Sequence, residues 1–119
     1  DAYTFFADIV RNAQKSIVLI DNYVDDSVLT LFTKRSKHVT VTIYTREIHK
    51  QLQLDLDKYN TQYPSIEIRR FKESHDRFMI IDDTLVYHFG ASLKDLGKKW
   101  FAFSKFDKEA IKLLDRLKS

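Results

Sequence analysis

Cysteine, glycine, proline and long apolar runs are all scarce or missing in this 119-residue sequence. Without cysteine the chain has no disulfides and no thiolate metal sites, which fits a reducing cytoplasm, and we expect a cytoplasmic protein. With two glycines it lacks both glycine-rich motifs that cradle nucleotide phosphates, G-x-G-x-x-G and G-x-x-x-x-G-K. The longest apolar runs, such as residues 17–20, are too short to cross a membrane, so no membrane partner is expected.

What is present is the composition of a folded domain. Hydrophobic residues make up 44% and charged residues 31%, enough for a core and for a polar surface. A length of 119 residues predicts a single domain over residues 1–119. The chain begins Asp-Ala-Tyr without an initiator methionine, and we expect it to be a fragment of a longer protein. The net charge of +3 is by itself weak support for a nucleic-acid partner.

Hydrophobic periodicity alternates between helix and strand in the first part of the chain. The expected order is helix, strand, helix, strand, helix, strand, at residues 3–14, 16–23, about 26–34, 39–45, 48–63 and 65–72. Asp25, Asp26 and Ser27 can cap the second helix, and Lys34 and Arg35 lie at its end. This alternation is typical of an α/β domain with parallel strands.

The pattern changes in the second part of the chain. Residues 77–81 and 85–89 predict two strands of a hairpin, joined by a turn at 82–84. Residues 100–103 predict a further strand, and residues 107–118 predict a closing helix. We therefore predict an α/β layered sandwich with a mixed, largely parallel sheet flanked by helices.

The polar residues best suited to catalysis or phosphate binding lie close together in the sequence. His75 and Arg77 share one face if their segment is a strand, with Cα atoms roughly 6.5 to 7 Å apart. A neutral imidazole can act as nucleophile or acid, and a guanidinium offers a fork of donors that matches phosphate oxygens. If the strand continued to Asp82, its side chain would point to the opposite face, so we expect Asp82 to lie in a turn or to support the site. The alternative is that His75 is a hydrogen-bonded structural residue at a strand entrance.

A family resemblance favours a catalytic role for His75 over a structural one. The string His-Asp-Arg-Phe-Met-Ile-Ile-Asp at residues 75–82, followed by Gly-Ala-Ser at 90–92, resembles the H-x-K-x4-D and G-S-x-N elements of the phospholipase D superfamily. That superfamily includes phospholipases, phosphatidyl transferases and bacterial endonucleases with one motif per chain. Residues 74–104 also resemble the C-terminal part of bacterial proteins that carry a phage-antirepressor-type DNA-binding domain upstream.

The resemblance implies a metal-independent, cofactor-free attack on a phosphodiester, in which two motifs meet at a two-fold axis. By position, His75 would be the nucleophile or acid, and Arg77 would take the lysine place. Asp82 would take the supporting aspartate place, and Gly90 would let the backbone approach the phosphate. Because this chain carries one motif, the resemblance implies a homodimer through the His75 face.

The sequence departs from the family pattern at three points. Arg77 replaces lysine, which keeps the charge but changes the geometry. The asparagine place falls on Leu93, which has no donor. Seven residues separate Asp82 from Gly90, where the family usually has six. A bulge that absorbed the extra residue would bring Ser92 into the donor's place, and without one Leu93 would point into the site.

Other residues could contribute to such a site. Basic residues flank the motif at Arg69, Arg70, Lys72, Lys94, Lys98 and Lys99, and Lys94 is the one we expect near the phosphate. Asp21 ends the first strand, where α/β sheets bind ligands, and could orient a histidine. His88 could face the site or be structural. No clustered ligand set suggests a metal.

Two functions from different classes remain open. The first is a metal-independent phosphodiesterase, a bacterial nuclease acting through His75 in a homodimer. The alternative is a catalytically inactive DNA-binding or dimerisation module that accompanies an upstream DNA-binding domain. A phospholipid-processing enzyme ranks third, because the sequence has no amphipathic membrane-binding segment.

Overall fold

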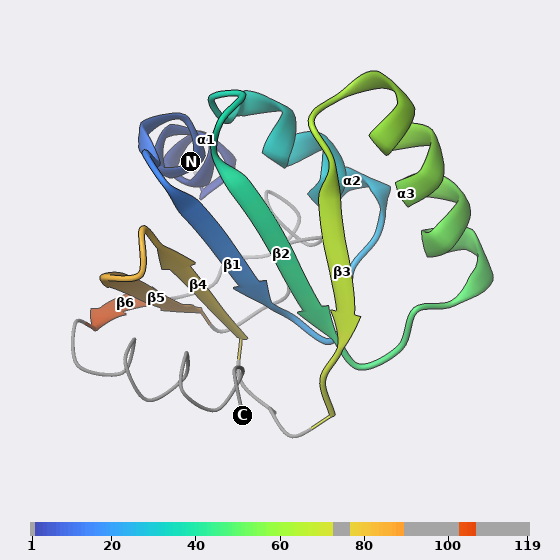
Figure 1. The fold of residues 1–119 in the computed structure, drawn as a ribbon. Helices are drawn as coiled ribbons and strands as arrows, with labels where there is room; N and C mark the ends of the chain where they lie inside the picture. Colours follow the sequence, from blue (N-terminus) through green and yellow to red (C-terminus); the bar gives the residue numbers. More distant parts are fainter. Residues whose placement is uncertain (1, 73–76, 90–102, 107–119) are drawn as a thin grey trace.

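The computed structural model describes residues 2–72, 77–89 and 103–106 (Figure 1). The helices are α1 (Ala2–Asn12), α2 (Asp26–Leu31), the 3-10 helix η1 (Phe32–Lys34) and α3 (Lys50–Gln62). The strands are β1 (Ser16–Ile20), β2 (Thr40–Thr45), β3 (Ile66–Arg70), β4 (Arg77–Ile81), β5 (Leu85–Phe89) and β6 (Phe103–Phe106). In the described part of the chain, no helix is long and apolar enough to span a membrane.

The strands form one mixed sheet in the order β3-β2-β1-β4-β5-β6. β1, β2 and β3 pair in parallel, and β4 pairs antiparallel with β1. β5 is antiparallel to β4 and β6 to β5, so β5 runs in the direction of β1, β2 and β3. The sheet is therefore mixed, with most of its described strands running in one direction, as predicted.

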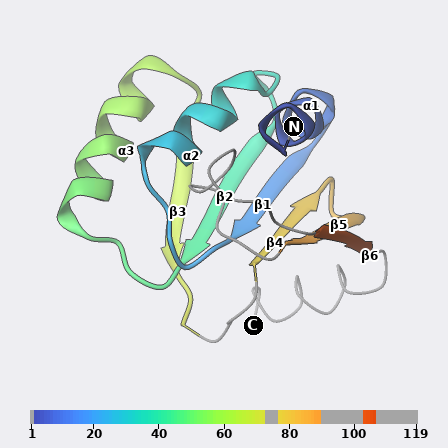
Figure 2. The same ribbon diagram turned by 180° about the vertical axis from the view of Figure 1, so that it is seen from behind.

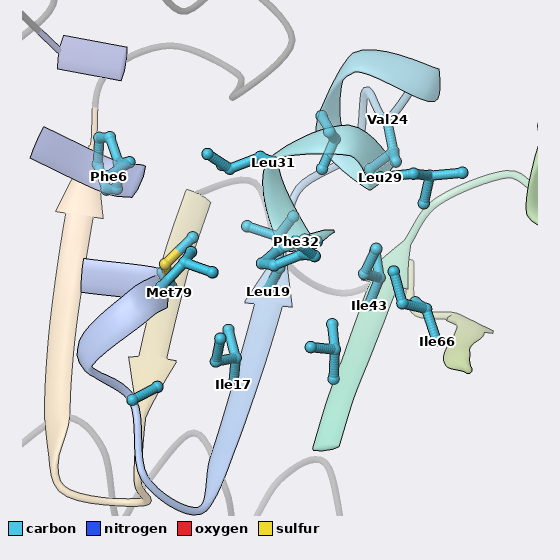
Figure 3. Close-up of a cluster of buried hydrophobic side chains, with 14 of the residues drawn as sticks. Phe6, Ile17, Leu19, Val24, Leu29, Leu31, Phe32, Ile43, Ile66 and Met79 are labelled. Carbon is cyan, nitrogen blue, oxygen red and sulfur yellow. The ribbon is translucent and has the colours of Figure 1, made fainter. Parts of the chain in front are cut away.

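The described helices cover one face of the sheet, on the side turned to the viewer in Figure 2. Apolar side chains of α1, α2 and α3 pack there against alternate residues of the strands, including Ile17, Leu19, Ile43 and Met79 (Figure 3). The opposite face carries a second, smaller buried cluster, of Ile20, Ile80 and Val86. Strand residues of this sheet thus bury apolar side chains on both faces, which explains the short continuous apolar runs in the sequence.

Element boundaries differ from the predicted ones where a side chain binds the backbone. The first strand was expected to reach residue 23 but ends at Ile20, because the Asp21 carboxylate accepts a hydrogen bond from the Tyr23 N–H and turns the chain. α3 begins at Lys50 because His49 Nδ1 accepts from the Leu52 N–H as its N-cap. Asp25 caps α2, as predicted.

The hairpin strands 77–81 and 85–89 are confirmed at both ends. Of the strand expected at 100–103, only Phe103 is described, and it begins β6. The closing helix expected at 107–118 lies outside the described residues.

Arg35 is the largest departure from the predicted surface. It was expected as a cation at a helix end, but it is 7% exposed. Its guanidinium donates five hydrogen bonds, to Tyr59 Oη and to the carbonyl oxygens of Phe32, Val39, Pro64 and Ser65. Burial raises the pKa of the Tyr59 hydroxyl, and the hydrogen bond from Arg35 partly opposes that rise. This cation ties α3 and the starts of β2 and β3 together.

Candidate functional site

Two of the predicted site residues, Asp21 and Arg77, lie at the end of the sheet where β1, β2 and β3 finish and β4 begins, called here the carboxyl end. In the antiparallel β1–β4 ladder, Ile20 is paired with Phe78. One step further along this register brings Asp21 opposite Arg77. Directly opposed residues in such a ladder have Cβ atoms about 4.5–5.5 Å apart. The register thus places Asp21 level with Arg77, and the expected role of Asp21 in orienting a histidine stays a prediction.

Strand alternation directs these two side chains to the same face. Leu19 and Met79 belong to the cluster under the helices, and Asp21 and Arg77 lie two residues away from them along β1 and β4. Asp21 is fully buried and Arg77 is half-buried. A buried carboxylate beside a guanidinium can hold that guanidinium in one orientation.

Backbone contacts hold Asp21 in place. Its Oδ1 accepts from the Tyr23 N–H at 3.0 Å, and its own N–H donates to the Tyr44 carbonyl at 3.0 Å. The residue thus joins the end of β1 to the end of β2. Its position suits the orienting role expected from the sequence, because it is anchored before any substrate arrives.

Asp82 lies at the opposite end of β4, called here the amino end of the sheet because β1, β2 and β3 begin there. Its carboxylate accepts from the N–H groups of Gln14 at 3.1 Å, Lys15 at 2.6 Å and Ser16 at 3.1 Å. Burial alone would raise its pKa, but these backbone donors and the charge of Lys15 outweigh it, so the pKa is lowered. Five residues of strand put it roughly 16 Å from Arg77. Asp82 therefore supports the fold and cannot touch a phosphate held at Arg77.

The hairpin contains no bulge in its described ladder. The pairs run without interruption from Arg77 with Phe89 to Ile81 with Leu85. The extra residue of this sequence is therefore not absorbed between Leu85 and Phe89. Asp82 and Asp83 form the turn with positive φ angles of 55° and 60°. Whether a bulge follows Phe89 decides between Ser92 and Leu93, and both alternatives stay open.

Several predicted site residues lie outside the described residues. They are His75, Gly90, Ser92, Leu93 and Lys94. Their roles stay predictions from the sequence. What the structure adds is the position of Arg77, two residues after His75, at the carboxyl end.

His88 does not share the face of Arg77. It is paired with Phe78 across the hairpin, and the two rings stack with centroids 4.8 Å apart. Phe78 packs against the cluster on the sheet face opposite the helices. Of the two alternatives for His88, the stacking on Phe78 favours the structural one, because Arg77 points to the other face of the sheet.

Basic residues collect at the carboxyl end. The described ones are Arg46 after β2, Arg70 and Lys72 at the end of β3, and Arg77 at the start of β4. The exposed Arg69 is instead paired with Glu67 at 2.6 Å. Sequence reasoning identified this concentration of charge around the motif but missed Arg46, which lies 29 residues before His75. The rule that singled out Asp21, ligand binding where parallel strands end, also applies to Arg46.

The acidic pair Asp25 and Asp26 lies at the start of α2. Asp25 Oδ1 accepts from the Ser27 N–H at 3.0 Å and so caps α2, as expected. Within residues 2–72, 77–89 and 103–106, no three His, Asp or Glu side chains gather as a metal would require.

Comparison with known proteins identifies the fold. No protein-family model and no curated protein matches the sequence. NucT from Helicobacter pylori is similar in structure, with a TM-score of 0.70 and 16% identity over 98% of this chain and 84% of NucT. TrmBL2, an archaeal chromatin protein whose structure shows a novel mode of DNA binding, has a TM-score of 0.62 and 15% identity. That match covers 97% of this chain and 46% of TrmBL2. This chain therefore shares the fold of NucT, and the predicted α/β sandwich with a mixed sheet flanked by helices is confirmed.

Proposed function

We propose that this chain is one half of a metal-independent phosphodiesterase that cleaves nucleic acid, completed by a second copy of itself. The observation that carries the proposal is the β1–β4 register, which places Arg77 level with the buried Asp21 at the carboxyl end, directly after the segment that contains His75. The phospholipase D-like fold supports a nuclease or phosphodiesterase. We further propose a bacterial, cytoplasmic protein, from the sequence resemblance and the absence of cysteine.

The proposed reaction has two steps. His75 attacks the phosphorus atom, a P–N bond forms, and the bond from phosphorus to the leaving oxygen breaks. The partner subunit's His75 gives that oxygen a proton. Water then attacks the phosphohistidine, the partner's His75 takes a proton from the water, and the P–N bond breaks to regenerate His75.

Arg77 suits the phosphate-binding role in this scheme. Its guanidinium is permanently charged and offers two parallel donors to the phosphoryl oxygens. A lysine at this place would present a single point charge. Arg77→Lys restores the residue of the family motif and is expected to retain activity.

An inactive DNA-binding or dimerisation module is the second candidate. The match to TrmBL2 favours it, because that protein binds DNA. The sequence favours it through Leu93, which offers no donor where the family has asparagine. Loss of one preorganised donor lowers a rate by about 100- to 1,000-fold. If Leu93 points into the site, weak and salt-sensitive binding without turnover is expected.

Product formation from nucleic acid in EDTA separates these candidates. Wild-type protein is expected to cleave, and His75→Ala is expected to abolish cleavage. Ser92→Ala should slow it by roughly 10- to 1,000-fold if its hydroxyl replaces the missing donor. Lys37→Gln, which removes an exposed cation at the amino end of the sheet, is the matched control and should keep the turnover rate.

Equal rates for wild type and His75→Ala would end the enzyme proposal. Light scattering tests the homodimer separately. A strictly monomeric protein at high concentration would contradict both the shared site and the catalytic scheme, because one chain supplies a single motif histidine.

A further inference from the structure

A cavity of about 450 Å³ opens at the carboxyl end, on the side of the sheet that the helices cover. It is lined by Asn22, Tyr23 and Val24, which follow β1, and by Arg46, Glu47 and His49, which lie between β2 and α3. Small-molecule sites commonly occupy roughly 300–1,000 Å³. The cavity is thus large enough for one nucleotide.

An exposed aromatic ring and a cation share this cavity. Tyr23 is 58% exposed, the most exposed of the large hydrophobic residues in the described chain. An exposed tyrosine offers a flat face on which a base can stack. Arg46 is also exposed, and it belongs to neither the Arg11–Asp8 nor the Arg69–Glu67 ion pair.

The remaining polar lining residues complement the edge of a base. His49 accepts the Leu52 N–H at Nδ1, which leaves Nε2 as the nitrogen that donates. The carboxylate of Glu47 can accept from an exocyclic amino group. Because Glu47 also repels phosphate, the cavity is suited to one base with one phosphate on Arg46, rather than to a row of phosphates.

The cavity lies within reach of Arg77 along one nucleic-acid strand. β2 and β4 both flank β1, so Arg46 and Arg77 are on strands two positions apart, which is roughly 10 Å. A single strand with one phosphate at Arg77 can therefore reach the cavity within a few nucleotides.

We propose that this cavity binds a nucleotide of a single-stranded nucleic acid, with its base stacked on Tyr23 and its phosphate bound by Arg46. This rests on the proposed function for its substrate class and adds a second contact to the site at Arg77. Such a contact would fix the path of the strand across the active site, because Arg46 lies on one side of Arg77.

Binding of a fluorescent single-stranded oligonucleotide tests the proposal. Fluorescence anisotropy is measured with full-length His75→Ala protein, which prevents cleavage, and with the same protein carrying one further change. Tyr23→Ala should weaken binding roughly 10-fold, the contribution of one stacked base. Arg46→Gln should weaken it and lower the slope of log K against log salt by about 0.7, the share of one phosphate on a single strand.

Matched controls lie at other exposed positions. Tyr3→Ala removes an exposed tyrosine of α1, and Lys37→Gln removes an exposed cation at the amino end. Both should leave affinity and salt slope unchanged. Circular dichroism confirms that each variant is folded.

The outcomes separate this inference from the proposed function. If wild type cleaves but Tyr23→Ala and Arg46→Gln bind like the parent, the cavity proposal is wrong and the nuclease stands. If the two variants lose affinity while wild type does not cleave, the cavity proposal stands for a binding module. If Tyr3→Ala and Lys37→Gln lost as much affinity as Tyr23→Ala and Arg46→Gln, the proposal would be overturned. Affinity would then depend on overall charge and exposed aromatic area and not on the cavity.

Discussion

The two ends of the sheet use the same kinds of side chain for different purposes. At the amino end, Arg35 is buried, and its guanidinium donates to carbonyl oxygens and a tyrosine hydroxyl. Asp82 at the same end accepts hydrogen bonds from three backbone N–H groups. At the carboxyl end, Arg46 is exposed beside a cavity and Arg77 is half-buried beside Asp21. A cation satisfied by the backbone stabilises the fold, whereas one that faces a cavity can bind a ligand.

Replacement of Arg35 should produce the largest loss of stability. Arg35→Met keeps much of the side-chain volume but leaves buried carbonyl oxygens without donors, so the free energy of unfolding should fall by about 3 kcal/mol or more. Arg35→Lys should lose most of that amount, because an ammonium group cannot match the fork of acceptors. Urea denaturation measures both changes.

Arg46→Gln is the control at the carboxyl end. Its effect on the free energy of unfolding should stay within about 0.5 kcal/mol, as for most exposed substitutions. If Arg46→Gln destabilised the protein as much as Arg35→Met, the contrast between the two ends would be refuted.

Asp82→Asn should have an intermediate effect that depends on pH. At neutral pH the loss of the charged acceptor should cost about 1 kcal/mol, since partial exposure screens the carboxylate. The folded-state pKa lies below the unfolded value, so the carboxylate stabilises the fold above about pH 4 and loses this effect as pH falls through the folded pKa. Urea titrations of both proteins from pH 7 to pH 3 should show the difference shrinking below about pH 4. A constant difference across that range would contradict the assigned role.

Asp83→Gly should have the smallest effect, and it should stabilise. Asp83 has a φ of 60°, where glycine lacks the steric penalty of a side chain. The greater freedom of glycine in the unfolded chain partly offsets this gain, so the free energy of unfolding should rise by about 0.3–0.5 kcal/mol. Thr84→Gly is the control, because Thr84 has no positive φ and should lose stability. Thermal unfolding distinguishes the two, and a loss in both variants would contradict the turn geometry.

Local patterns in the sequence determined most of the secondary structure. The alternation of helix and strand, the hairpin at 77–81 and 85–89, and the cap at Asp25 depend on neighbours within a few residues, and each is confirmed. The resemblance of residues 75–82 to the phospholipase D motif gave the fold, which the structural comparison supports. These signals are readable because periodicity and capping act over short distances along the chain.

Contacts between distant segments decided the rest. Lys34 and Arg35 are adjacent and both basic, but Lys34 is exposed and Arg35 is buried. Arg35 is buried because its guanidinium donates to the carbonyl group of Pro64. Asp82 meets Gln14, Lys15 and Ser16 across 66 to 68 residues. The cavity likewise joins residues after β1 to residues after β2. Local sequence patterns do not predict these long-range contacts, because the parallel pairing of β1 with β2 decides which side chains lie at the same end of the sheet.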